Sequence, residues 1–332
     1  MGDNLKFLIA GFGSIGKRHF DNLEKCGNIE ISVLTRRGLK IPNTRVYGSL
    51  EEVGQKNFDA VFIANETSLH IPTALFFAEK GCNLFIEKPL SNNLENIDKL
   101  KAAVNSHHLK VMIGCNMRFH PVLQLLKDLV RKGEIGRVVS ARIEAGQYLP
   151  DWHPERDYRD SYSARDEKGG GVILDLIHEL DGAYWLFREA KKVTCFSGKQ
   201  SGLEIDTEDL AEILMEFKDN VLCSVHLDYI QRYPSRTIKL VGTEGTILAD
   251  LIANKIEIFK AAKGEWETID LNRGFEKNTM YLNEVKSFID YIRGIIKESP
   301  ISLQDGIKVL QLALAAKKSS LSGKAIEIKD IA

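Results

Sequence analysis

Lys6-Phe-Leu-Ile-Ala-Gly-Phe-Gly-Ser-Ile-Gly16 is the stretch of sequence that decides the fold. Its first half is a short apolar run, which predicts a buried strand, and residues 17–26 have the composition of a helix. In that context the three glycines at G-x-G-x-x-G spacing have separate tasks: a tight turn, close approach of the backbone to a pyrophosphate, and packing of the helix on the strand. The residues predicted to bind a dinucleotide here are Gly11, Phe12, Gly13, Ser14, Ile15 and Gly16.

Size and composition narrow the class of protein. The chain has 332 residues, enough for about two domains, and a net charge of -1, with no basic block that indicates nucleic acid or a membrane surface. Five cysteines without a C-x-x-C pair indicate reduced thiols rather than disulfides or a metal site. No apolar run is long enough to span a bilayer, and no signal peptide precedes the first strand, so we expect a cytoplasmic protein.

The first part of the chain alternates strands and helices. This order predicts a doubly wound α/β sheet of parallel strands, with ligands bound beyond the carboxyl ends of the strands. We place this Rossmann domain at residues 1–120. The expected strands are Phe7–Ala10, Glu30–Thr35, Ala60–Ala64, Asn83–Glu87 and Val111–Gly114, and the expected helices are Gly16–Cys26, Ser49–Val53, Leu69–Lys80 and Asn92–Ser106.

Residues 121–332 have a different pattern, with strands joined by short turns. Short turns indicate antiparallel pairing, so we expect an α+β domain with a large, mostly antiparallel, open sheet. The expected strands are Val138–Gln147, Lys192–Lys199, Leu210–Lys218, Val221–Ile230, Arg236–Val241, Thr246–Asp250, Lys255–Phe259 and Thr268–Leu271. The expected helices are His120–Lys132, Tyr281–Ile296 and Ser302–Leu321.

One face of this second sheet is expected to lack helices. The alternating residues Val221, Cys223, Val225, Leu227 and Tyr229 are partly apolar, and we assign them to that open face. An open apolar face favours a homodimer or homotetramer formed through it.

Glu87-Lys88-Pro89 ends an expected strand at the predicted cofactor edge. The proline biases Lys88 towards an extended backbone. The plain alternative is a charged, solvated strand end.

A second cluster follows Gly169-Gly-Gly171, in a helix that is otherwise apolar. Gly171, Asp175, His178 and Gly182 have helical spacing, which predicts one stripe of small and polar residues. Histidine exchanges a proton near neutral pH, and Asp175 could orient it. The alternative is a core histidine that is satisfied by Asp175.

Together these motifs resemble the glucose–fructose oxidoreductase / inositol dehydrogenase / rhizopine-catabolism family of NAD(P)-dependent oxidoreductases. The matching segments are Gly11–Gly16, Glu87–Pro89, Asn116-Met-Arg-Phe-His-Pro121, Gly169 to His178, and Gln311–Gly323. The resemblance implies that Lys88 is the active-site lysine and Glu87 the ribose-side carboxylate. It also implies that His178 is the acid/base residue, with Asp175 as its partner.

The sequence departs from the family pattern at two points. Two residues separate Asp175 and His178, where many members have three, and Asn65-Glu66 stands where the family often has Thr-Pro. Further cofactor contacts are expected at Asn65, His70, Glu87, Lys88 and Asn116.

Thr35-Arg36-Arg37 follows the second expected strand, where an acidic residue would bind the ribose 2′-hydroxyl. Two guanidinium groups suit a 2′-phosphate, so NADP is favoured and NAD stays open. The alternative is a pair of solvated surface arginines.

The aromatic and arginine-rich segment Tyr148–Arg165 suits stacking on a sugar, although it could be an ordinary polar loop. The predicted substrate-binding residues are Arg118, Tyr148, Trp152, His153, Arg165, Asp175, His178 and Tyr229. We therefore expect a dehydrogenase that acts on a secondary alcohol of a sugar, cyclitol or sugar derivative. The tyrosine-rich segment resembles family members of amino-sugar or surface-glycan metabolism. The alternatives are a glycosidase with transient NAD redox chemistry and a non-catalytic nucleotide sensor.

Overall fold

The computed structural model describes residues 4–54 and 56–331, which form two compact units. The first unit contains the described residues up to Asn116 together with Lys277–Ile307. The second contains Met117–Glu276 and the described residues from Lys308 onwards. A single boundary at residue 120 therefore misses one feature: a late segment of the chain returns to the first unit.

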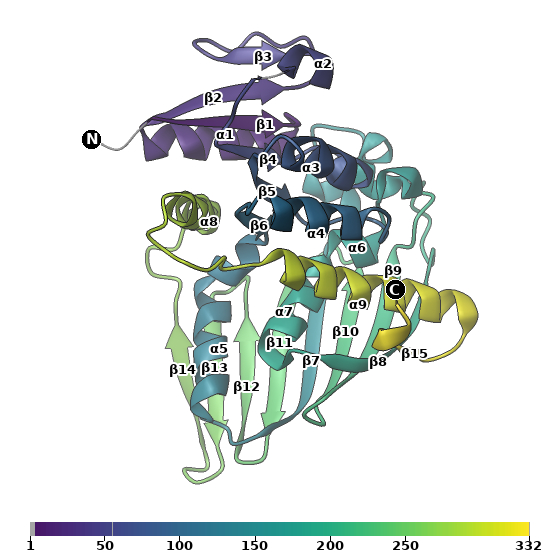
Figure 1. Cartoon of the computed structure of the whole chain (residues 1–332). Coiled ribbons are helices and arrows are strands. Elements are labelled where there is room, and N and C mark those ends of the chain that lie inside the picture. Colours follow the sequence, from purple (N-terminus) through teal and green to yellow (C-terminus); the bar gives the residue numbers. More distant parts are fainter. Residues whose placement is uncertain (1–3, 55, 332) are drawn as a thin grey trace. The chain divides into compact units, whose positions relative to one another are not determined.

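The first unit is built on a parallel sheet, which within the described residues has six strands in the order β3-β2-β1-β4-β5-β6 (Figure 1). The strands are β1 (Leu5–Ala10), β2 (Ile29–Leu34), β3 (Arg45–Tyr47), β4 (Ala60–Ile63), β5 (Asn83–Glu87) and β6 (Val111–Gly114). Every residue of β4 and β6 is buried, as expected for strands that helices cover on both faces. The predicted doubly wound sheet is confirmed, and the short strand β3 extends it.

The helices of this unit begin and end close to the predicted bounds. They are α1 (Ser14–Cys26), α2 (Leu50–Val53), α3 (His70–Ala78), α4 (Ile97–Ser106) and, from the late segment, α8 (Lys277–Ile292). Helix α4 begins five residues later than predicted, directly after Asn96, which adopts a left-handed conformation. Helix α8 packs its buried Phe288 against Phe7, Phe62 and Phe85 of the sheet.

The second unit holds a sheet that has nine strands within the described residues. They are β7 (Val138–Gly146), β8 (Ala190–Gly198), β9 (Leu210–Phe217), β10 (Leu222–Asp228), β11 (Ser235–Gly242), β12 (Gly245–Asp250), β13 (Lys255–Lys260), β14 (Glu265–Asp270) and β15 (Ile326–Glu327). Their order is β14-β13-β12-β11-β7-β10-β9-β8-β15, and the neighbouring pairs are antiparallel except β7 and β10. The predicted mostly antiparallel sheet is confirmed.

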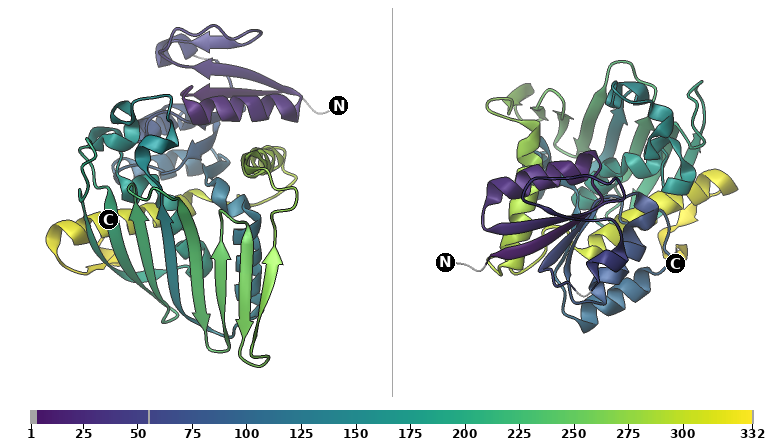
Figure 2. Two further views of the ribbon diagram at one scale, coloured as in Figure 1. Left: turned by 180° about the vertical axis from the view of Figure 1, so that it is seen from behind. Right: turned by 90° about the horizontal axis from the view of Figure 1, so that it is seen from above.

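Helices lie along one face of this sheet, and the view from behind shows the strands of the other face uncovered (Figure 2). They are α5 (Pro121–Lys132), α6 (Val172–Asp175), α7 (Ile177–Phe187) and the later turns of α9 (Leu303–Ser322). Helix α5 illustrates why the sequence folds locally: His120 accepts a hydrogen bond from the Val122 amide, Pro121 stands in the first turn, and Gly133 ends the helix in a left-handed conformation.

The apolar alternation in β10 was assigned to the wrong face. Val221, Cys223, Val225 and Leu227 are buried on the helix-covered side, whereas Leu222 is exposed. Because successive side chains of a strand point to opposite faces, a shift of one residue exchanges the whole set.

Within residues 4–54 and 56–331, no helix is long and apolar enough to cross a membrane.

Candidate active site

The glycine turn has two glycines that the packing requires and one that it leaves open. A Cβ added at Gly11 would lie 2.4 Å from the Asn65 amide nitrogen, and one at Gly16 would lie 2.1 Å from the Gly11 carbonyl oxygen. A Cβ added at Gly13 would meet no atom within 4 Å. Gly11 and Gly16 thus serve the contact of helix α1 with the strands. Gly13 borders open space, where a ligand can approach the backbone.

Two further features of this edge suit a dinucleotide. Helix α1 begins after Gly13 without a side-chain cap, so its first amides face a region that an anion can occupy. The Asn65 side-chain oxygen is buried and has no hydrogen-bond partner in the protein, while its amide group donates to Thr73 (2.9 Å). The residues present therefore fit a bound dinucleotide.

The end of β2 places its arginines differently. Arg37 donates to the Phe12 carbonyl oxygen (3.2 Å), which ties this loop to the glycine turn. Arg36 is exposed beside it. The backbone amide of Arg37 lies 3.4 Å from the Thr35 hydroxyl, which it contacts as a donor. Of the two guanidinium groups, that of Arg36 is therefore the one directed to solvent rather than to the turn.

His70 is buried at the same edge and contacts the backbone of two loops. Its Nδ1 lies 2.8 Å from the Pro89 carbonyl oxygen and its Nε2 lies 3.2 Å from that of Asn65. Burial lowers the pKa of His70, so the ring is neutral and donates from one nitrogen only. The shorter contact, to Pro89, is the better candidate for that hydrogen bond.

Glu87 and Lys88 lie at the end of β5. One Glu87 oxygen lies 2.6 Å from His19 Nε2, and the other accepts a hydrogen bond from the Lys88 backbone amide (3.2 Å). The resemblance implied a ribose contact for Glu87, whereas the structure shows it buried and bonded to these two groups. Glu87 thus holds the backbone of Lys88 in place.

A second carboxyl group lies behind this pair. Glu284 of α8 is fully buried, and no side chain among the described residues is hydrogen-bonded to either of its oxygens. Burial raises the pKa of Glu284 well above its ordinary value, and the Glu87 carboxylate raises it further. Burial thus favours the protonated form of Glu284, next to Glu87, which His19 contacts.

In the second unit, the predicted continuous helix after Gly171 is broken. Helix α6 ends at Asp175, Leu176 departs from helical geometry (φ -90°, ψ 34°), and α7 begins at Ile177. The predicted stripe therefore does not run along one helix. Asp175 belongs to α6, whereas His178 and Gly182 share α7.

Asp175 is buried and accepts hydrogen bonds from three hydroxyl groups. The donors are Tyr162, in a short contact, Ser163 (2.5 Å) and Tyr229 (3.1 Å). Burial raises the pKa of Tyr229 well above its ordinary value, so this phenol stays protonated. The hydroxyl ring around Asp175 supplies the hydrogen bonds that a buried carboxylate needs.

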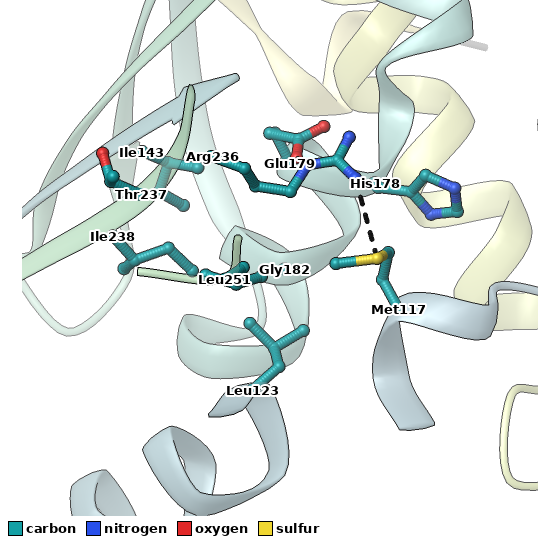
Figure 3. A pocket seen from close by; sticks show the side chains of 10 residues that line it. All are labelled: Met117, Leu123, Ile143, His178, Glu179, Gly182, Arg236, Thr237, Ile238 and Leu251. Carbon is teal, nitrogen blue, oxygen red and sulfur yellow. Dashed lines mark hydrogen bonds and ion pairs between the residues drawn. The ribbon is translucent and has the colours of Figure 1, made fainter. Parts of the chain in front are cut away.

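His178 lies at the edge of a small pocket, with its ring turned away from the pair Arg236–Glu179 (Figure 3). Arg236 Nε lies 2.8 Å from Glu179 Oε1, and Arg236 Nη1 donates to the Met117 sulfur at 3.7 Å. The pocket has room for about one water molecule. This pocket is too small to hold a sugar.

Arg118, predicted to contact substrate, is buried instead. Its guanidinium donates two hydrogen bonds to Asp181 of α7, at 2.8 and 2.6 Å. A bidentate buried pair of this kind fixes the position of a helix. The structure therefore shows Arg118 as a support for α7, the helix that carries His178.

The other predicted substrate residues separate into two groups. Trp152 packs edge-on against the ring of Tyr229, with centroids 5.4 Å apart, and the Tyr229 hydroxyl donates to Asp175. Tyr148 stacks under the Arg232 guanidinium at 3.5 Å. His153 and Arg165 instead face acidic partners, Glu155 (3.5 Å) and Asp206 (3.7 Å) respectively.

Several site residues were not predicted from the sequence: Tyr162, Ser163, Glu179, Arg236, His19 and Glu284. Tyr162 and Ser163 stand in the aromatic segment that drew attention, but nothing in their spacing marks them as partners of Asp175. The sequence signal for Glu284 is a glutamate at a position of α8 that helical spacing assigns to the apolar face, since charged side chains are rarely buried without a partner.

Comparisons with known proteins agree with both units. Residues 5–115 match a family model described as an oxidoreductase family with an NAD-binding Rossmann fold. Residues 123–248 match the model of the GFO/IDH/MocA C-terminal domain.

The relatives include dehydrogenases of cyclitols and sugars. The chain is 26% identical over 348 residues to the myo-inositol 2-dehydrogenase of Thermotoga maritima, across 98% of this chain and 99% of the relative. It is 32% identical over 224 residues to the levoglucosan dehydrogenase of Pseudarthrobacter phenanthrenivorans, across 59% of this chain and 56% of the relative.

A solved structure shows the same fold. The WlbA dehydrogenase from Bordetella pertussis, in complex with NADH and UDP-GlcNAcA, superimposes with a TM-score of 0.83 at 20% identity. The comparison covers 98% of each chain.

The open space at Gly13 generates the first prediction. Gly13→Val should abolish NAD(P)H binding, because the new side chain occupies the space next to the turn, while the melting temperature stays close to that of the wild type. Gly16→Ala is the matched control: its Cβ would collide with the Gly11 carbonyl, so it should lower the melting temperature. Titration calorimetry and thermal unfolding measure both effects. Unchanged NAD(P)H affinity in Gly13→Val would contradict the assignment of this turn.

Proposed function

Because the chain belongs to the GFO/IDH/MocA family of NAD-binding oxidoreductases, we propose that it is a dehydrogenase of a sugar, cyclitol or sugar derivative. The reaction is hydride transfer between the nicotinamide and a carbon that carries a secondary hydroxyl group. The observation that carries the proposal is a turn built for a dinucleotide on one unit, together with a buried carboxylate, Asp175, and a histidine, His178, on the other. The cyclitol and sugar dehydrogenases among the relatives support the substrate class.

Three residues of the chain have a role in the proposed reaction. His178 takes the proton of the substrate hydroxyl during oxidation and returns it during reduction. Lys88, whose backbone Glu87 holds, donates a hydrogen bond to the same oxygen, as the family resemblance implies. Asp175, which three hydroxyl groups hold in place, is the partner of His178 that the family resemblance implies.

The cofactor, when bound, supplies the hydride acceptor, and the protein supplies placement. The residues that would hold it are the glycine turn with its loop arginines, the Asn65 oxygen and Asn116. Trp152 and Tyr148 offer ring faces to a sugar. Turnover of free NAD⁺ or NADP⁺ to the reduced form separates this proposal from a glycosidase, which would return its bound cofactor to the starting state.

The acid/base role of His178 can be tested by substitution. His178→Ala should lower kcat by about 10²–10⁴-fold, the usual share of general acid–base catalysis. Lys88→Ala should fall in the same range, and the double variant should lose less than the product of the two if they act on one oxygen. NAD(P)H affinity of His178→Ala should stay unchanged.

His107→Ala is the control, since this histidine lies at the end of α4 with its side chain exposed. The near-neutral limb of the pH–rate profile should vanish in His178→Ala and persist in His107→Ala. Near-normal turnover of His178→Ala would show that the proton leaves by another route.

We further propose a preference for NADP(H), which rests on Arg36. Arg36→Ala should weaken NADP⁺ binding roughly tenfold or more, as expected for the loss of one charge-assisted hydrogen bond, and leave NAD⁺ binding unchanged. Lys40→Ala removes one positive charge from the same loop and should change neither affinity. Equal affinity of Arg36→Ala and the wild type for NADP⁺, measured by calorimetry, would refute the preference.

We also propose that the chain forms a homo-oligomer through the open face of its large sheet. Three apolar side chains are exposed on neighbouring strands of this sheet: Phe196 of β8, Leu214 of β9 and Leu222 of β10. Between them lie the polar residues of the same face, among them His226. A hydrogen bond to Asp228 raises the pKa of His226 to about 9, so this histidine is charged at neutral pH. A face that mixes apolar and charged groups resembles a subunit interface.

Leu214→Glu tests this interface. It should reduce the mass in solution, measured by light scattering, from a dimer or tetramer towards the 37.3 kDa of one chain. Leu321→Glu changes another exposed leucine, at the end of α9, and should leave the mass unaltered. A wild-type protein that is already monomeric would refute the proposal.

A further inference from the structure

The hydroxyl ring around Asp175 contains one member that differs from the others. Ser163 and Tyr229 are buried, with exposed fractions of 3% and 0%, whereas Tyr162 is 36% exposed. All three side chains donate to the same carboxylate. Tyr162 is therefore the member of this ring whose side chain is partly exposed on the second unit, with its hydrogen bond to Asp175 partly buried.

The backbone around Tyr162 is fixed by the three-glycine turn. A Cβ added at Gly170 would lie 2.3 Å from the Tyr162 carbonyl oxygen and 2.7 Å from that of Ser163. The Gly171 amide donates to the Ser163 carbonyl (3.1 Å), and so does the Thr207 hydroxyl (3.1 Å). This close approach explains why the turn requires glycine at position 170. The hydrogen bond from the Gly171 amide joins the glycine turn to residues 162 and 163. Because Asp175 follows this turn in α6, the same contact holds Tyr162 close to Asp175.

The direction of the hydrogen bond determines what Tyr162 can offer to a ligand. A phenol has one proton, and the proton of Tyr162 is donated to Asp175. Its oxygen can therefore act towards a ligand only as an acceptor. An acceptor whose proton is held by a carboxylate is stronger than an isolated phenol, since the negative charge polarises the O–H bond. The complementary ligand group is a hydroxyl that donates.

We propose that Tyr162 is a specificity-determining residue, whose phenolic oxygen accepts a hydrogen bond from one hydroxyl group of the substrate. The inference rests on the proposed function, because it takes the substrate to be a sugar or cyclitol. The recognised hydroxyl need not be the one that is oxidised. No bond is formed or broken at Tyr162: it selects substrates that carry a donor at this position and disfavours those that lack it.

Tyr162→Phe tests the inference, with Tyr158→Phe as the matched control. Tyr158 stands four residues earlier in the same segment, and its hydroxyl accepts from the Glu204 backbone amide (3.1 Å) instead of binding Asp175. The probes are myo-inositol, levoglucosan and D-glucose, each with its monodeoxy analogues, assayed with NAD⁺ and NADP⁺. NAD(P)H affinity and melting temperature are measured for every variant.

Tyr162→Phe should lower kcat/KM for the best parent compound about tenfold, which corresponds to the loss of one hydrogen bond to a polarised acceptor. It should lower kcat/KM little for the one analogue that lacks the recognised hydroxyl, so that the wild-type preference for the parent over that analogue disappears. NAD(P)H affinity should stay unchanged, and Tyr158→Phe should behave as the wild type.

The contrary results are distinct. A wild type that turns over a probe, with Tyr162→Phe unaffected or weakened equally on every analogue, would overturn the role of Tyr162 and leave the proposed function intact. A wild type that neither turns over nor binds any of these probes would overturn the proposed function and this role with it.

Discussion

The close approach of three backbone segments at Gly11 is the constraint on which the first unit depends. A side chain at Gly11 would collide with the backbone of Ala64 and Asn65, and one at Gly16 with Gly11 itself. Strand β1, the end of β4 and the first turn of α1 can therefore meet only if these positions have no Cβ. Their contact places the α1 amides, Gly13 and the Asn65 side chain at one edge of the sheet. The close packing of the strands and the helix therefore also forms the dinucleotide site.

Buried charge is the second organising feature of this unit. His19 packs against the rings of Phe62 and Phe85 and contacts Glu87, whose charge raises the pKa of the buried Glu284. Polar groups in such an apolar surrounding are costly unless they are paired, so their geometry is strongly specified. This geometry also fixes the backbone of Lys88, because the Lys88 amide donates a hydrogen bond to Glu87. A lysine at a strand end would otherwise be free to adopt many positions, and its proposed role requires one.

Local patterns predicted the parts of the fold that have local causes. The glycine spacing, the apolar strands and the helix expected over His120–Lys132 depend on residues close together in the sequence, and each was found near its predicted place. The short strand β3 and the parallel pairing of β7 with β10 depend on residues far apart, and no local period records them. The face of β10 was misassigned for a related reason: alternation indicates that a strand has two different faces, but only the position of α7 and its neighbours decides which one is covered.

The candidate site shows the same limit most sharply at Asp175 and His178. Helical spacing placed them on one stripe, and the separation by two residues looked like a small change from the family pattern. The structure instead ends one helix at Asp175 and begins another at Ile177, so periodicity cannot be carried across Leu176. What holds Asp175 is a set of hydroxyl groups from residues 162, 163 and 229, two of which stand 12 and 13 residues away and the third 54. A carboxylate that is satisfied by three hydroxyl donors can stay charged and fixed inside the protein. The break in the helix then leaves His178 on α7, whose position depends on the separate pairs Arg118–Asp181 and Arg236–Glu179. Asp175 and His178 are therefore positioned by two independent sets of contacts, so their separation in the sequence does not by itself determine how they lie in the structure.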